Sequence, residues 1–276
     1  MNMPSVGRPI APREHGVWAV LYGSFLVGVG VAGRVTLPAA LLVVGTTAVV
    51  FANGSLSILA RWSAKDGQRE RRRHALIWFM LYGAIAAAAF GPLLVVFRMA
   101  FLLLFGVGAA CFLLLRMFLI REGDDRTLIG ELIGAAGLTM VGPVTHAVSV
   151  GEVQAISLIL WLLLFLFFAS GVFYVRMRVH SMVSQRKGAS ASNREWWPCV
   201  AYHVFLIIVI PTLLWVRVVP WPAFLAYAPA VWRAAAGLSR KAARLDLRRL
   251  GWSEVALAAA FVVILIAAFR LTPLAG

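Results

Sequence analysis

Negative charge is scarce in this sequence. Only 11 of the 276 residues are Asp or Glu, and charged residues of both signs make up 13% of the chain. Soluble domains are about one quarter charged and about half apolar, whereas 62% of this chain is apolar. No stretch long enough for a soluble domain lacks an apolar run. We therefore predict that residues 1–276 form a single integral membrane domain.

Cysteine is equally rare. Cys111 and Cys199 both lie inside apolar runs without the spacing of metal ligands, so we predict buried, unpaired thiols and no metal site. The 26 Lys and Arg residues could suggest nucleic-acid binding. They fall, however, in short clusters between apolar runs and not on a soluble basic face. We expect no nucleic-acid partner, and membrane lipid instead.

Long apolar runs are abundant. A helix needs about 20 mostly apolar residues to cross the hydrocarbon core. The sequence has nine such runs and predicts an all-α, polytopic transmembrane bundle of about nine helices. The eighth run is short and rich in proline. The predicted segments are 17–33, 38–60, 75–96, 99–120, 127–149, 154–175, 197–216, 218–232 and 252–270.

The basic residues predict how this bundle is oriented. With nine crossings, 22 of the 26 Lys and Arg residues fall on the side of the N-terminus. The other side keeps Arg34, Arg98, Arg217 and Arg270. Without the eighth crossing, 16 basic residues would lie on the side of the N-terminus and 10 on the other side. That division fits the positive-inside rule poorly. We predict a multi-pass protein of the cell membrane with its N-terminus in the cytoplasm and its C-terminus outside.

Ionisable and polar groups at membrane depth are costly, which makes them candidates for a binding site. Asn53, Ser57 and Arg61 recur every four residues and share one face of the second helix. On the sixth helix, Tyr174 pairs in the same way with Arg178, and Arg176 with His180. The arginines either serve only as topology signals that extend to the headgroups or form a shared pocket for phosphate or carboxylate.

Two further groups complete the candidate substrate-binding residues. Arg13, Glu14 and His15 come together at the start of the first helix, where Pro12 and Glu14 also suit a plain helix start. Glu131 lies among glycines that permit close helix contact. We expect it to be the one acid at membrane depth, to face the bundle and to meet a cytoplasmic arginine. Alternatively, this contact could be a buried ion pair that only fixes the packing of the helices.

Three stretches resemble the YwiC-like family of bacterial membrane proteins. They are Pro-Arg-Glu-His-Gly-Val-Trp-Ala (12–19), Gly-Glu-Leu-Ile-Gly-Ala-Ala-Gly-Leu (130–138) and Phe-Ala-Ser-Gly-Val-Phe-Tyr-Val-Arg (168–176). The resemblance extends over most of the chain. It implies a membrane protein and carries no defined activity with it.

A more distant resemblance connects the chain with the UbiA superfamily of prenyltransferases. Nine crossings and polar sites on the second and sixth helices are similar to those enzymes, whose aspartate motifs hold magnesium and a prenyl diphosphate. Asn53 matches the asparagine of the first motif, Asn-Asp-x-x-Asp-x-x-x-Asp. Non-acidic residues replace the aspartates, namely Gly54, Ser57 and Arg61 in the first motif and Arg176, Arg178 and His180 in the second. Because magnesium sites need carboxylates, the resemblance implies the fold but not the metal-dependent reaction.

These observations predict a protein that binds or moves a lipid-like or isoprenoid anion in a cavity facing the cytoplasm. A metal-independent or degenerate UbiA-like prenyltransferase is one alternative. A small-molecule transporter or an accessory subunit of a membrane complex is another. The sequence leaves open the enzyme question, any cofactor and the oligomeric state.

Overall fold

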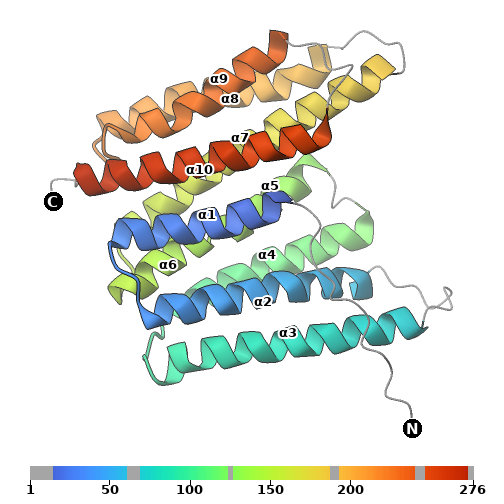
Figure 1. Ribbon diagram of the computed structural model, residues 1–276, viewed down its shortest axis with the longest axis vertical. Coiled ribbons are helices and arrows are strands. Elements are labelled where there is room, and N and C mark those ends of the chain that lie inside the picture. Colours follow the sequence, from blue (N-terminus) through green and yellow to red (C-terminus); the bar gives the residue numbers. More distant parts are fainter. Residues whose placement is uncertain (1–14, 61–68, 124–126, 187–192, 240–245, 273–276) are drawn as a thin grey trace.

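The computed structural model describes residues 15–60, 69–123, 127–186, 193–239 and 246–272. Within these ranges all regular structure is helical, which confirms the predicted all-α class. Ten helices follow one another along the chain (Figure 1). They are α1 (His15–Ala32), α2 (Leu37–Ala60), α3 (Arg69–Val95), α4 (Leu102–Glu122), α5 (Leu128–Thr139), α6 (Val141–Val150), α7 (Ala155–Arg186), α8 (Asn193–Trp215), α9 (Ala223–Ser239) and α10 (Leu247–Leu271).

Each predicted segment coincides with one helix, except that the fifth contains two. Helices α5 and α6 are separated only by Met140 and together form one apolar stretch, Leu128–Val150. Counted this way, seven of the described helices are long and apolar enough to cross a membrane, so the chain is a multi-pass membrane protein. The shorter α1 and α9 run alongside these helices (Figure 1). Their crossing, and with it the total of nine, stays a prediction.

The spans alternate in direction, so α1 begins at one end of the bundle and α10 finishes at the other (Figure 1). The four arginines predicted to lie outside all belong to the end where α10 finishes. Arg98 and Arg217 occupy the tight turns α3–α4 and α8–α9 with positive φ angles of 52° and 56°. Arg34 donates a hydrogen bond of 2.8 Å to the carbonyl oxygen of Val150 in the neighbouring turn. Which end faces the cytoplasm stays a prediction.

Helix α7 lies closest to the centre of the bundle. Half of the residues in the most apolar stretch of α7 are buried, compared with 11% of those in the corresponding stretch of α4. Phe167 of α7 stacks on Phe261 of α10 with ring centroids 3.8 Å apart. The outer faces of α3, α4 and α8 expose large apolar side chains, which lipid can cover. Cys111 belongs to the exposed face of α4, so the prediction of two buried thiols was wrong for it and is confirmed for Cys199.

Two glycines allow α1 and α6 to touch backbone to backbone. A Cβ atom built on Gly28 would lie 2.5 Å from the carbonyl oxygen of Gly142. A Cβ atom on Gly142 would lie 2.2 Å from Cδ1 of Leu164 in α7. A larger side chain at Gly28 would force the helices apart, because the contact is with backbone, whereas at Gly142 the Leu164 side chain would have to move. This contact fixes α1 beside the α5–α6 span, and so shapes the site described next.

Candidate functional site

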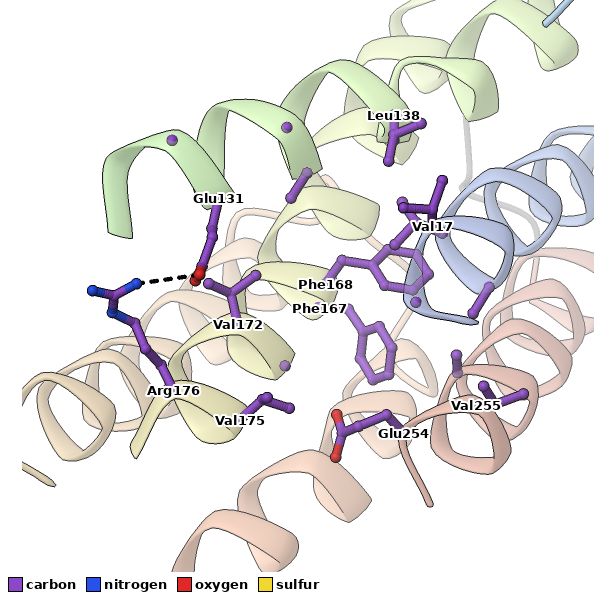
Figure 2. Close-up of a pocket in the computed structure, with 18 of the residues that line it drawn as sticks. Val17, Glu131, Leu138, Phe167, Phe168, Val172, Val175, Arg176, Glu254 and Val255 are labelled. Atoms are coloured by element: carbon purple, nitrogen blue, oxygen red, sulfur yellow. Dashed lines mark ion pairs between the residues drawn. The ribbon is translucent and has the colours of Figure 1, made fainter. Parts of the chain in front are cut away.

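A cavity of about 740 Å³ opens at the end of the bundle where α1 begins. Seven helices contribute to its wall: the starts of α1, α5 and α10, the ends of α2 and α4, and the C-terminal halves of α7 and α9. Figure 2 shows apolar side chains such as Val17, Phe167 and Phe168 around much of it. We call it the charged cavity, because five Arg and Glu side chains also line it. They are Arg116, Glu131, Arg176, Arg233 and Glu254.

Glu131 reaches the charged cavity from the first turn of α5. The Thr127 side chain caps this helix by accepting a hydrogen bond of 3.2 Å from the Gly130 amide. A carboxylate in the first turn is favoured by the positive end of the helix dipole. Glu131 and Arg176 of α7 form an ion pair of 3.2 Å across the cavity wall (Figure 2). The predicted contact between Glu131 and a basic side chain is therefore present.

A second ion pair joins Arg233 of α9 to Glu254 of α10. The Arg233 side chain is only 9% exposed, and its guanidinium carbon lies 4.4 Å from the centroid of the Tyr174 ring. Its Nη2 also donates a hydrogen bond of 3.4 Å to the Ser170 hydroxyl. Arg233 thus connects α7, α9 and α10. Because breaking a buried pair leaves an unbalanced charge, we assign this pair a structural role.

Arg116 of α4 differs from the other two arginines. Its Nε atom is buried without a hydrogen-bond partner, and no described residue forms an ion pair with it. Its guanidinium lies against α5, where a Cβ atom on Gly134 would be 2.8 Å from Nη1. Gly134 follows Glu131 by three residues and so shares its helix face. Among the described residues, three arginines therefore meet two glutamates in this cavity, and the unmatched positive charge is that of Arg116.

The structure brings some of the predicted site residues to the charged cavity. Ser57, Glu131 and Arg176 line it, as does His180. The Ser57 hydroxyl donates a hydrogen bond of 2.8 Å to the backbone oxygen of Asn53. The Asn53 side chain is half-buried, and its Oδ1 atom has no hydrogen-bond partner. Asn53 therefore supports the wall of the cavity from the turn below Ser57.

Tyr174 and Arg178 lie elsewhere. Arg178 is 7% exposed and donates a hydrogen bond of 3.0 Å to the carbonyl oxygen of Gly237 in α9. Tyr174 also packs on Gly237, where a Cβ atom would come within 2.5 Å of its ring. Neither residue lines the charged cavity, although Tyr174 contacts Arg233. Of the three arginines expected to share one pocket, Arg176 lines the charged cavity, Arg178 instead joins α7 to α9, and Arg61 lies outside the described residues.

Three of the candidates cannot be placed. Arg13, Glu14 and Arg61 lie outside the described residues, and His15 is described only as the first residue of α1. The next two residues, Gly16 and Val17, line the charged cavity.

Sequence reasoning missed Arg116, Arg233 and Glu254. Arg116 and Arg233 were counted only as topology signals at helix ends. Glu254 lies three positions into the last predicted segment, 252–270, and an acid inside an apolar run is a signal that could have found it. The expectation that Glu131 is the one acid at membrane depth was therefore wrong. Among the described residues, no three His, Cys, Asp or Glu side chains gather as a metal site would require.

Comparison with known proteins finds two similarities. The family described as YwiC-like protein matches residues 11–146, a range that includes Ser57, Arg116 and Glu131. A Bacillus subtilis (strain 168) protein named "Uncharacterized protein YwiC" is 24% identical over 227 residues, which cover 82% of this chain and 85% of that protein. No solved structure matches. The UbiA-like resemblance gains no support from these comparisons. The chain is thus similar to the YwiC-like family over residues 11–146 and to the Bacillus subtilis protein over most of its length.

Proposed function

We propose that this protein binds a lipid-like or isoprenoid anion and that the charged cavity holds its anionic group. The observation that carries this proposal is Arg116, whose charge has no counterpart among the described residues of the cavity. Arg116 is half-buried with its Nε atom buried, and a guanidinium that is partly removed from water is stabilised when an anion neutralises it. Phosphate and carboxylate match its planar fork with two parallel hydrogen bonds.

Arg176 would be the second contact of that anion. Its partner Glu131 is 39% exposed, so the pair is accessible to competition from a ligand in the cavity. An anion between Arg116 and α5 would draw Arg176 away from Glu131, because a phosphate carries more charge than one carboxylate. The buried pair of Arg233 and Glu254 would stay intact and hold the opposite wall.

The 22-to-4 division of basic residues supports a cavity that opens to the cytoplasm. Anionic headgroups in that leaflet would meet the arginines at this end of the bundle. The whole chain, 1–276, would act as one membrane domain.

Transport is a second candidate, because the span that carries Glu131 is interrupted. Helix α5 ends at Thr139, and α6 starts at Val141 with Pro143 in its first turn. Broken spans at binding sites are typical of secondary transporters. Release of a labelled alkyl phosphate from vesicles that contain the protein would separate transport from binding alone.

Titration of dodecyl phosphate into the full-length protein in dodecylmaltoside micelles tests the binding proposal. We expect Arg116→Ala to weaken binding by about 1.5–3 kcal/mol, the range for a lost hydrogen bond to a charged group. Arg116→Lys should restore part of it, because it keeps the charge but loses the fork.

Arg121→Ala is the matched control, because Arg121 is exposed on the same helix. It should bind like the parent. Partitioning of the probe into micelles is the same for all variants. If Arg116→Ala binds as tightly as the parent, Arg116 is only a topology signal, and the proposal is wrong.

A further inference from the structure

Resting on the proposed function, we infer that a second cavity holds the hydrocarbon chain of the molecule whose anionic group lies beside Arg116. This apolar cavity has a volume of about 560 Å³ and lies between α2, α3, α4 and the α5–α6 span. Its ligand would be an amphiphile with one anionic group and a hydrocarbon chain, and not a water-soluble anion.

The chemistry of the apolar cavity suits a hydrocarbon and nothing polar. Thr46 supplies the single hydroxyl among its lining side chains. That hydroxyl donates hydrogen bonds of 2.9 Å and 3.2 Å to the backbone oxygens of Leu42 and Val43, so its donor is already used. A polar ligand would lose its hydration here without any replacement.

The two cavities meet at α5. Leu138 lines both of them, and Figure 2 shows it on the far side of the charged cavity from Arg176 and Glu254. Gly134 lines the charged cavity and Gly137 the apolar one, so α5 presents little side-chain bulk between them. Phe112 of α4 also packs on Gly137, where a Cβ atom would lie 3.3 Å from its Cβ, so a chain attached to a group beside Arg116 has to pass both Leu138 and Phe112.

The apolar cavity also lies at the right depth. On α4 its wall ends at Ala110, six residues before Arg116, and starts at Leu102. At 1.5 Å per helical residue, it extends from about 9 Å to about 21 Å from Arg116 along the helix axis. That direction leads from the Arg116 end of α4 through the middle of the span to Leu102, its first residue, so the cavity lies within the apolar length that the chain of an anionic amphiphile would occupy.

Photolabelling tests this placement. The probe is hexadecyl phosphate with a diazirine at the chain end, added to the full-length protein in dodecylmaltoside micelles. Peptide mass spectrometry should find adducts within 42–50 and 102–110. Arg116→Ala should reduce them about tenfold, which corresponds to the loss of one charge-assisted contact.

Gly106→Trp is intended to fill the apolar cavity, which Gly106 lines, and it starts from open space because a Cβ atom there meets nothing within 4 Å. It should abolish the adducts but leave Arg116-dependent binding of octyl phosphate intact. Gly83→Trp on α3 is the matched control, since Gly83 is equally open, exposed and outside both cavities.

Three outcomes overturn the inference in different ways. If octyl phosphate binding depends on Arg116 while the diazirine labels only residues outside 42–50 and 102–110, the chain lies elsewhere and the proposed function survives. If adducts within 42–50 and 102–110 form equally in the parent and in Arg116→Ala, the apolar cavity accepts any hydrocarbon chain and does not depend on the anionic group beside Arg116. If neither binding nor labelling depends on Arg116, the proposed function fails as well.

Discussion

The guanidinium of Arg116 rests on the bare backbone of Gly134, one helical turn from Glu131. A Cβ atom at Gly134 would lie 2.8 Å from Nη1 of Arg116. The atom that would have to move is the end of a flexible side chain, so Gly134→Val should displace Arg116 without unfolding the protein. We expect weaker binding of dodecyl phosphate and little change in melting temperature in detergent. Gly83→Val, whose Cβ meets nothing within 4 Å, is the control. Unchanged binding by Gly134→Val would show that the anion does not need Arg116 in this position.

The exposed ion pair of Glu131 and Arg176 should stabilise the fold only slightly. Its larger effect should be on ligand binding, because Glu131 competes with the ligand for Arg176. Their side chains are 39% and 28% exposed, and such pairs stabilise a fold by less than about 1 kcal/mol. Glu131→Gln should leave dodecyl phosphate binding intact or tighten it, because Arg176 loses its carboxylate competitor. The melting temperature should fall slightly. A marked loss of binding in Glu131→Gln would instead assign the carboxylate a direct role toward the ligand.

The buried pair of Arg233 and Glu254 should behave in the opposite way. Removing one partner leaves a charge in a poorly solvated position, which costs about 3–5 kcal/mol when the pair is fully buried and less at the 9% and 20% exposure seen here. We expect Glu254→Gln to lower the melting temperature clearly. Arg249→Ala is the comparison, since its pair with Asp246 is 91% and 55% exposed and should contribute little. Equal melting temperatures for both variants would contradict the structural role of Arg233.

The contact between Gly28 and Gly142 predicts a position that tolerates no side chain. In Gly28→Ala the new methyl group would lie 2.5 Å from a backbone oxygen, which cannot rotate away. Separating α1 from α6 should lower the melting temperature, because the two helices would lose their close packing. Alanine at Gly83 should instead be neutral or slightly stabilising, because alanine favours helix over glycine. A stable Gly28→Ala protein would mean that these helices pack less closely than described.

The orientation of the bundle can be tested with reporter fusions. Fusions after residues 70, 190 and 243 should report the cytoplasm, and fusions at 35, 151 and 276 the outside, because 22 of the 26 basic residues then lie inside. The fusion after 243 decides the crossing of α9. An external signal at 243 together with a cytoplasmic signal at 276 would mean that α9 does not cross.

The sequence alone determined the class and the layout of this protein. The number and order of the apolar segments were predictable because apolar run length is dictated by membrane thickness, and every predicted segment corresponds to a helix or to the α5–α6 pair. Some helix ends were not, since α7 continues to Arg186, beyond the predicted end at 175. The contact of Glu131 with a basic side chain was also predictable, since an intramembrane acid needs a partner. Even the separation of Arg176 from Arg178 was accessible, because residues two apart do not share a helix face.

Only the tertiary structure decided which arginine lines the cavity. Helices such as α4 and α7 are apolar on nearly all sides, so their sequence carries no stripe that fixes their rotation about the helix axis. Neighbouring helices fix it instead. Gly134 makes room for Arg116, while the carbonyl of Gly237 holds Arg178 away from the cavity. Both are contacts between residues on different helices, and hydropathy along one helix does not encode them.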